Sequence, residues 1–188
     1  MGGEARLEQS DAHILRPTPG EIPGHYGFHN GMHDDFAMIR NGLYHLPFVK
    51  TLTNLTDLGP DDGGTAVIAG SHKLSNVDQA KVIQCALEDP DRFIHQVIAP
   101  AGSTLVFFES LIHSSGIIRS GKDRLLIIGG YTPPMFQAWT GYDVPAEFLA
   151  TVPPKHLPLI SGNKRWKWNR FFRKLEDPVG SLAPHIQV

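Results

Sequence analysis

Glycine and proline interrupt this chain along nearly its whole length, and that spacing most constrains the fold it can adopt. The 188 residues include 19 Gly and 15 Pro, spread between short β-prone runs. Because both residue types mark turns and break long helices, the pattern favours a strand-rich domain over a helical bundle. The predicted strands are Phe36–Ile39, Phe48–Leu58, Thr65–Ala69, Ile94–Ile98, Ser103–Glu109 and Arg124–Thr132.

Two turn clusters, residues 59–64 and 99–102, separate successive strands and predict antiparallel pairing across each turn. Between the strands, residues 76–88 carry apolar side chains at helical spacing, with Ser75 as the expected N-cap. We expect this helix to lie outside the sheets, with Cys85 as a small buried residue on it.

The C-terminal part of the chain differs in composition from the strand region. Prolines recur after Thr132 and predict a tail of short helices and turns, in which we expect no catalytic group. Within this tail, six of the eleven residues from Lys164 to Lys174 are basic and alternate with aromatic residues. We interpret that segment as an amphipathic helix docked on the domain, with binding of phosphate or membrane as the alternative.

The total charge and the cysteine count exclude several classes of protein. A formal net charge of -2 gives no reason to expect nucleic acid or an anionic membrane as the main partner. Cys85 is the single cysteine, which rules out an internal disulfide framework and favours a reducing compartment. The polar N-terminus does not resemble a secretory signal, and no apolar run approaches the ~20 residues of a membrane span. The sequence therefore predicts a cytoplasmic protein.

Three residues form a candidate metal site. In an extended strand alternate side chains share a face, so His33 and Asp35 can both reach one metal ion. His113, at the end of a later predicted strand, would add a second imidazole. Two imidazoles and one carboxylate form the facial arrangement that leaves open positions in non-haem Fe(II) oxygenases. The sequence therefore predicts metal-dependent oxidation.

Arg124 is the candidate anion-binding residue. It opens an apolar predicted strand, where a buried guanidinium that faces the cavity requires an anionic partner. A bound carboxylate can supply that partner, because the planar guanidinium donates two parallel hydrogen bonds to it.

With these residues in place, the chain resembles the phytanoyl-CoA dioxygenase family of Fe(II)- and 2-oxoglutarate-dependent oxygenases over about residues 28–134. The resemblance rests on His33-x-Asp35, on residues 52–64, on Gly70-Ser71-His72-Lys73, and on His113-Ser114-Ser115-Gly116 followed by Arg124. It implies that His33, Asp35 and His113 bind iron, that Arg124 holds the distal carboxylate of 2-oxoglutarate, and that Ser115 assists Arg124.

The resemblance also implies a fold and a reaction. The expected fold is mainly β, a double-stranded β-helix (a jelly-roll, cupin-like barrel) with a few flanking helices. Residues 1–188 would form a single domain, with a short leading segment (1–27), the barrel core (28–134) and a wrapping tail (135–188). The expected reaction hydroxylates a small organic substrate while 2-oxoglutarate and O2 become succinate and CO2. The acidic ligand Asp35 favours hydroxylation over halogenation.

Several alternatives remain open at this stage. His29, in a Phe-His-Asn-Gly segment that resembles a His-Gly-rich stretch of some relatives, can replace His33 as the first ligand. Glu109 is either an acid in the pocket or a charge at a strand edge. For the whole chain, the competing functions are a Zn-dependent hydrolase and a non-catalytic jelly-roll binding protein.

Overall fold

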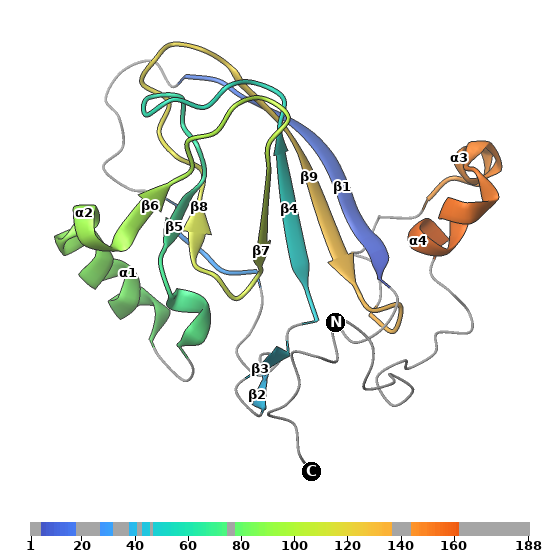
Figure 1. Ribbon diagram of the computed structural model, residues 1–188, viewed down its shortest axis with the longest axis horizontal. Helices are drawn as coiled ribbons and strands as arrows, with labels where there is room; N and C mark the ends of the chain where they lie inside the picture. Colours follow the sequence, from blue (N-terminus) through green and yellow to red (C-terminus); the bar gives the residue numbers. More distant parts are fainter. Residues whose placement is uncertain are drawn as a thin grey trace, which may run out of the picture.

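A computed structural model describes residues 5–17, 27–31, 38–40, 43–45, 47–74, 78–136 and 144–161 of the chain. Within these residues the protein is mainly β, and every strand pair is antiparallel. The largest sheet has four strands in the order β1-β9-β4-β7 (Figure 1). Its strands are β1 (Arg6–Leu15), β9 (Arg124–Thr132), β4 (Val49–Asn54) and β7 (Thr104–Phe108).

Two smaller sheets accompany it. The three-stranded sheet has the order β6-β5-β8, and a short hairpin pairs β2 with β3. The strands are β6 (Ile94–Gln96), β5 (Ala66–Ile68), β8 (His113–Ser114), β2 (Met38–Arg40) and β3 (Leu43–His45). The predicted class, mainly β with antiparallel sheets, is confirmed. The described strands remain three separate sheets, and no closure into one barrel is detected among them.

The predicted antiparallel pairing was right, but the predicted partners were wrong. The strands that flank residues 59–64 are β4 and β5, and those that flank residues 99–102 are β6 and β7. In both cases the two strands belong to different sheets, because β4 pairs with β7 and β9 while β5 pairs with β6 and β8. Each turn cluster is therefore a crossing between sheets and not a hairpin.

The edge strand β1 was not predicted from the sequence. It pairs with β9 over nine register positions, from Arg6 opposite Thr132 to Leu15 opposite Arg124, with an irregularity between Leu7 and Gln9. Its burial does not alternate regularly, and polar residues dominate its middle. The strand is held by backbone pairing to a long neighbour, and apolar periodicity contributes little to it.

Alternation along β4 and β9 defines the inner face of the large sheet. In β4 every second residue is buried, and Leu52 on this face pairs with Ile128 of β9. Leu52, Phe107 and Leu126 form a buried apolar cluster there. The same strands place polar residues on the inner face, because Lys50 and Asn54 have the parity of Leu52 and Arg124 that of Leu126. These polar positions form the site described below.

The principal helix, α1 (Gln79–Glu88), begins later than the sequence predicted. Asp78 is the N-cap, and its side chain accepts a hydrogen bond from the Ala80 N–H, while Ser75 lies outside the described residues. Val82, Ile83 and Ala86 pack α1 against the three-stranded sheet. Cys85 is exposed, which corrects its expected burial: the apolar face runs through Ala86.

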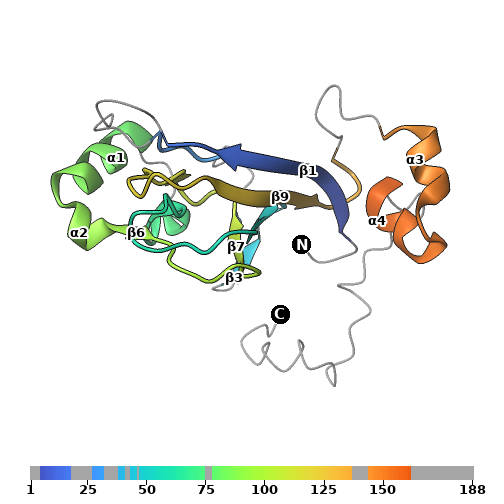
Figure 2. The same cartoon turned by 90° about the horizontal axis from the view of Figure 1, so that it is seen from above.

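Short helices complete the described chain. They are η2 (Ser71–Lys73), α2 (Pro90–Phe93), α3 (Ala146–Thr151), η3 (Pro154–His156) and α4 (Leu157–Ser161). Helices α1 and α2 lie at one end of the molecule and α3 and α4 at the other, where α4 contacts β1 (Figure 2). The predicted amphipathic helix at 164–174 lies outside the described residues. None of the helices that the structure describes has the length and hydropathy of a membrane span.

Close backbone contact joins the strands of the small sheet to the loop before β5. A Cβ added to Gly64 would overlap the carbonyl oxygen of Val97 and lie 3.1 Å from its carbonyl carbon. A Cβ on Gly116 would overlap the carbonyl oxygen of Gly64. Because the obstructing atoms belong to the backbone, they cannot move aside as a flexible side chain would.

This contact gives a stability prediction. Gly64→Ala should lower the free energy of unfolding by about 1–3 kcal/mol, because overpacking forces the backbone apart. Gly27→Ala is the matched control and should change it by less than about 0.5 kcal/mol, since a Cβ there meets nothing within 4 Å. Chemical denaturation of both variants measures the difference, and equal effects would contradict the close-contact interpretation.

Candidate active site

A cavity of about 370 Å³ lies against the inner face of the large sheet and reaches across to β8 of the small sheet. Leu52, Phe107 and Leu126 contribute apolar wall, while Arg124, His113 and Glu109 contribute polar groups. A mostly apolar cavity with a few convergent polar groups is the usual form of a small-molecule site.

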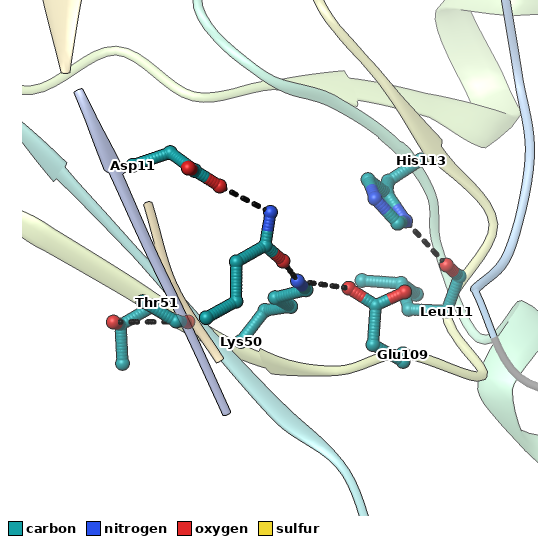
Figure 3. Close-up of polar contacts among 8 residues, drawn as sticks. Asp11, Lys50, Thr51, Glu109, Leu111 and His113 are labelled. Atoms are coloured by element: carbon teal, nitrogen blue, oxygen red, sulfur yellow. Dashed lines mark hydrogen bonds and ion pairs between the residues drawn. The ribbon is translucent and has the colours of Figure 1, made fainter. Parts of the chain in front are cut away.

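His113 enters this cavity from β8 and is 9% exposed. Its Nδ1 lies 2.8 Å from the carbonyl oxygen of Leu111 (Figure 3). The Phe107 ring packs edge-on against the imidazole, with the two ring centroids 4.7 Å apart. Burial lowers the pKa of His113 more than the Leu111 carbonyl raises it. A neutral imidazole whose Nδ1–H is donated to a carbonyl presents the lone pair of Nε2, as a metal ligand must.

Arg124 lies at the start of β9, 2% exposed, and lines the same cavity. Its guanidinium donates to the Gly63 carbonyl at 2.8 Å, to Thr65 Oγ1 at 2.9 Å and to Asn54 Oδ1 at 3.3 Å. All three acceptors are neutral, and its Nε has no hydrogen-bond partner. Among the described residues no carboxylate forms an ion pair with Arg124. Burial lowers the pKa of Arg124 from its ordinary value, but an arginine remains charged in a protein. The cavity therefore contains a buried cation with unused capacity for an anion.

The loop at residues 59–64 positions one of these acceptors. Asp62 Oδ2 accepts a hydrogen bond from the Gly59 N–H at 2.8 Å, and Asp62 pairs with Ile118 through an isolated β-bridge. The backbone turns at Gly63, where φ is +69°, and presents its carbonyl oxygen to Arg124. A non-glycine residue rarely adopts that conformation, so this glycine fixes the geometry of the carbonyl.

Ser115, the predicted assistant of Arg124, lines the cavity as well. Three of the five predicted site residues, His113, Ser115 and Arg124, are thus brought together. The other two, His33 and Asp35, lie outside the described residues. Their role stays a prediction.

His29, the alternative first ligand, lies directly opposite His113. The two residues exchange both backbone hydrogen bonds, at 3.0 and 2.9 Å, and form an isolated antiparallel bridge. Side chains of such a pair project from the same face, and the two ring centroids are 4.5 Å apart. His29 Nδ1 lies 2.9 Å from the Gly27 carbonyl oxygen, which repeats the arrangement at His113.

Glu109, at the end of β7, is 4% exposed and lines the cavity, so its interpretation as an exposed edge charge was wrong. Its Oε1 lies 3.9 Å from Lys50 Nζ, and Lys50 in turn donates to Gln9 Oε1 (Figure 3). Burial is the largest influence and raises the pKa of Glu109, against the opposing effects of Lys50 and His29. Lys50 and Gln9 were not predicted as site residues. Strand parity could have identified Lys50, because Lys50 has the same parity as buried Leu52 in β4.

Ser71 was also missed as a supporting residue. Its hydroxyl is buried and accepts a hydrogen bond from the Ile112 N–H at 2.8 Å. It therefore fixes the backbone immediately before His113. The sequence pointed to Gly70-Ser71-His72-Lys73 as a unit, and within it the serine supports the site.

No group of three His, Cys, Asp or Glu side chains converges at metal-binding distance within the described ranges. His29 and His113 form a pair of imidazoles whose ring centroids are 4.5 Å apart.

Comparison with known proteins identifies the family. The sequence matches the description "Phytanoyl-CoA dioxygenase (PhyH)" over residues 20–126, more than half of the chain. The chain belongs to the phytanoyl-CoA dioxygenase family. The matched range contains the cavity residues from His29 to Arg124.

Two curated relatives are similar to this chain. They are uncharacterised proteins of Mycobacterium bovis and Mycobacterium tuberculosis, each 30% identical over 116 residues. That match covers 61% of this chain and 39% of each relative, so the chain spans well under half the length of those proteins.

Solved structures support the fold. HygX from Streptomyces hygroscopicus with nickel and 2-oxoglutarate bound has a TM-score of 0.58 and 22% identity, over 73% of this chain and 59% of HygX. AviO1 from Streptomyces viridochromogenes has a TM-score of 0.54 and 19% identity, over 71% and 53%. SnoK, a non-haem α-ketoglutarate-dependent carbocyclase, has a TM-score of 0.51 and 20% identity, over 70% and 51%. At these identities the likeness establishes the fold that this family member shares with them.

The loop that presents Gly63 to Arg124 gives a pH prediction. Hydrogen bonds from Ser120 and from the Gly59 N–H, helped by Lys122, lower the pKa of Asp62 from its ordinary value of 3.8. Between the folded pKa and the ordinary value of 3.8, Asp62 binds more protons in the unfolded chain than in the folded one. Asp62 therefore stabilises the fold above pH 3.8, and this stabilisation is lost as the pH falls below that value. Denaturation series between neutral pH and pH ~2 should show a shallower acid loss for Asp62→Asn than for wild type.

Glu147→Gln, at an exposed acid on α3, is the control for this series. An acid loss in Asp62→Asn as steep as in wild type would contradict the role of Asp62.

Proposed function

We propose that this chain is an Fe(II)- and 2-oxoglutarate-dependent oxygenase that hydroxylates a small organic substrate. The observation that carries the proposal is the buried Arg124 guanidinium, which lines the same cavity as His113 and whose acceptors among the described residues are all neutral. HygX, a protein of the same fold, has been crystallised with iron and with nickel and 2-oxoglutarate, which supports the choice of cofactors.

Arg124 would bind a carboxylate of 2-oxoglutarate. Taking a guanidinium out of water is costly unless an opposite charge compensates it, and the described acceptors of Arg124 carry none. Three neutral acceptors nevertheless fix the orientation of the guanidinium before a ligand arrives, which reduces the entropy lost on binding. Ser115, at the same cavity, can donate a further hydrogen bond to that carboxylate.

His113 would bind the metal through Nε2, since its Nδ1 faces the Leu111 carbonyl. When iron and 2-oxoglutarate are bound, they supply the oxidising chemistry, with 2-oxoglutarate and O2 converted to succinate and CO2. The protein would orient the iron and 2-oxoglutarate and exclude water from them. Apolar side chains border the cavity for this purpose, those of Leu52, Phe107 and Leu126.

A small molecule fits the cavity better than a polymer. Its volume of about 370 Å³ lies near the lower end of the range for small-molecule sites. The related HygX structure with hygromycin B bound is a precedent for a small-molecule ligand on this fold. A Zn-dependent hydrolase does not require a buried arginine that binds the carboxylate of a cosubstrate. The buried Arg124 therefore favours the oxygenase.

The role of Arg124 can be tested by anaerobic titration of the Fe(II) protein with 2-oxoglutarate, followed by the visible charge-transfer band of the chelate. Arg124→Met should raise the 2-oxoglutarate concentration for half-saturation by about 10- to 150-fold, since hydrogen bonds to a charged group contribute ~1.5–3 kcal/mol. Arg124→Lys should give an intermediate half-saturation concentration, because lysine keeps the positive charge but cannot donate two parallel hydrogen bonds to a carboxylate.

Lys155→Met is the control, because it removes an exposed cation on η3 that does not line the cavity and should leave the titration unchanged. Thermal unfolding of each variant verifies that it is folded. Wild-type half-saturation in folded Arg124→Met would exclude the clamp.

The reaction class has its own test. Incubated with Fe(II), 2-oxoglutarate and O2, the wild-type protein should form succinate, and a true substrate from a small-molecule panel should increase that rate. Hydroxylation predicts a product heavier than the substrate by one oxygen atom, whereas cyclisation, the reaction named for SnoK, predicts loss of two hydrogens. Mass spectrometry separates the two, and a protein that forms no succinate with any substrate would favour a non-catalytic binding role.

A further inference from the structure

Gly31 and Glu109 share one space in the cavity. A Cβ built on Gly31 would overlap Glu109 Oε2 and lie 2.8 Å from the carboxylate carbon Glu109 Cδ. The Gly31 N–H also donates to the Glu109 backbone carbonyl at 3.0 Å, so the two residues are held together through the backbone as well. The carboxylate of Glu109 thus stands where a side chain of residue 31 would begin.

The position of residue 31 relative to His29 suggests a role for the Glu109 carboxylate that occupies this space. Gly31 follows His29 by two positions, the same spacing that separates Asp35 from His33 in the predicted pair of ligands, so the Glu109 carboxylate stands where a side chain at that spacing would begin. The chain has glycine at that position, and Glu109 brings a carboxylate into the vacant space from β7.

The two imidazoles have a separation suited to one metal ion. For imidazoles bound at right angles, a metal–nitrogen distance of about 2.1 Å plus ~1.1 Å to the ring centre places the centroids ~4.5 Å apart. The His29 and His113 centroids are 4.5 Å apart. Each ring has its Nδ1 beside a backbone carbonyl, of Gly27 and Leu111 respectively, which leaves both Nε2 atoms available.

We propose that Glu109 supplies the carboxylate ligand of the metal site, with His29 and His113 as the two imidazole ligands. This inference rests on the proposed function and specifies its metal centre. The set has the two imidazoles and one carboxylate that suit a divalent ion such as Fe(II). It replaces the ligands His33 and Asp35 that the resemblance implied.

Closing this site requires movement of one side chain. The three groups do not converge at ligand distance within the described residues, and Glu109 Oε1 faces Lys50 Nζ at 3.9 Å. The Glu109 carboxylate can turn toward the imidazoles by rotation about its own side-chain bonds, which moves no backbone atom.

Mn(II) binding, measured by loss of the electron paramagnetic resonance signal of free Mn(II), tests this assignment without any turnover. Glu109→Gln and His29→Ala should each weaken Mn(II) binding by about 100-fold or more, because loss of a ligand exceeds the 10–100-fold effect of losing a ligand's supporting partner. His33→Ala and Asp35→Asn should bind within about threefold of wild type, and exposed His95→Ala controls for adventitious histidine binding.

Relocating the carboxylate gives a second, independent readout. Gly31→Asp alone should weaken Mn(II) binding, because the new side chain collides with Glu109. Gly31→Asp combined with Glu109→Ala should restore binding to within about tenfold of wild type, since the obstructing atoms belong only to the Glu109 side chain. Glu109→Ala alone, which leaves the space empty, is the matched control and should remain weak.

The outcomes separate this inference from the proposed function. Loss of Mn(II) binding in His33→Ala or Asp35→Asn, with binding retained in Glu109→Gln, would overturn the Glu109 assignment and leave the oxygenase proposal intact. Wild-type protein that binds no Mn(II) would overturn both.

Discussion

The buried guanidinium of Arg124 connects the two principal sheets and fixes the shape of the cavity. It belongs to β9 and donates to Asn54 of β4 within the large sheet. It also donates to Gly63 and Thr65, which precede β5 of the small sheet. A charge at 2% exposure is costly unless its donors find acceptors, so the loop before β5 must take the conformation that supplies those of Gly63 and Thr65. Stability and the proposed anion binding are thereby coupled at one residue.

The opposite side of the cavity depends on backbone pairing around His113. Val67 pairs with it on one side and His29 on the other, while Ser71 holds the preceding peptide. These contacts leave the ring with its Nδ1 beside a carbonyl and its remaining nitrogen available. The proposed metal ligand is therefore positioned by the small sheet, and the proposed anion-binding residue by the large one. The proposed function requires both sheets in register.

Much of this arrangement could be predicted from the sequence. The strands that became β4, β5, β6, β7 and β9 follow from apolar runs bounded by turn residues. His113 and Arg124 were predicted from their place at strand ends and Ser115 from the family resemblance, and the structure gathers them at one cavity. Strand partners were not predictable in the same way. The clusters at 59–64 and 99–102 read as hairpin turns, yet each joins two sheets, because turn chemistry fixes where the chain reverses and leaves the choice of neighbour to packing.

The sequence by itself determined the class of the fold, the family, and which residues are candidates for the chemistry, since these depend on composition, local periodicity and motif order. Tertiary structure alone decided that Arg124 is a buried cation with neutral acceptors, that His29 lies opposite His113, and that Glu109 occupies the space beside Gly31. Those facts link residues up to 84 positions apart in the chain, between His29 and His113. No local pattern encodes them, because they arise from the pairing of strands whose partners are selected by the burial of whole faces.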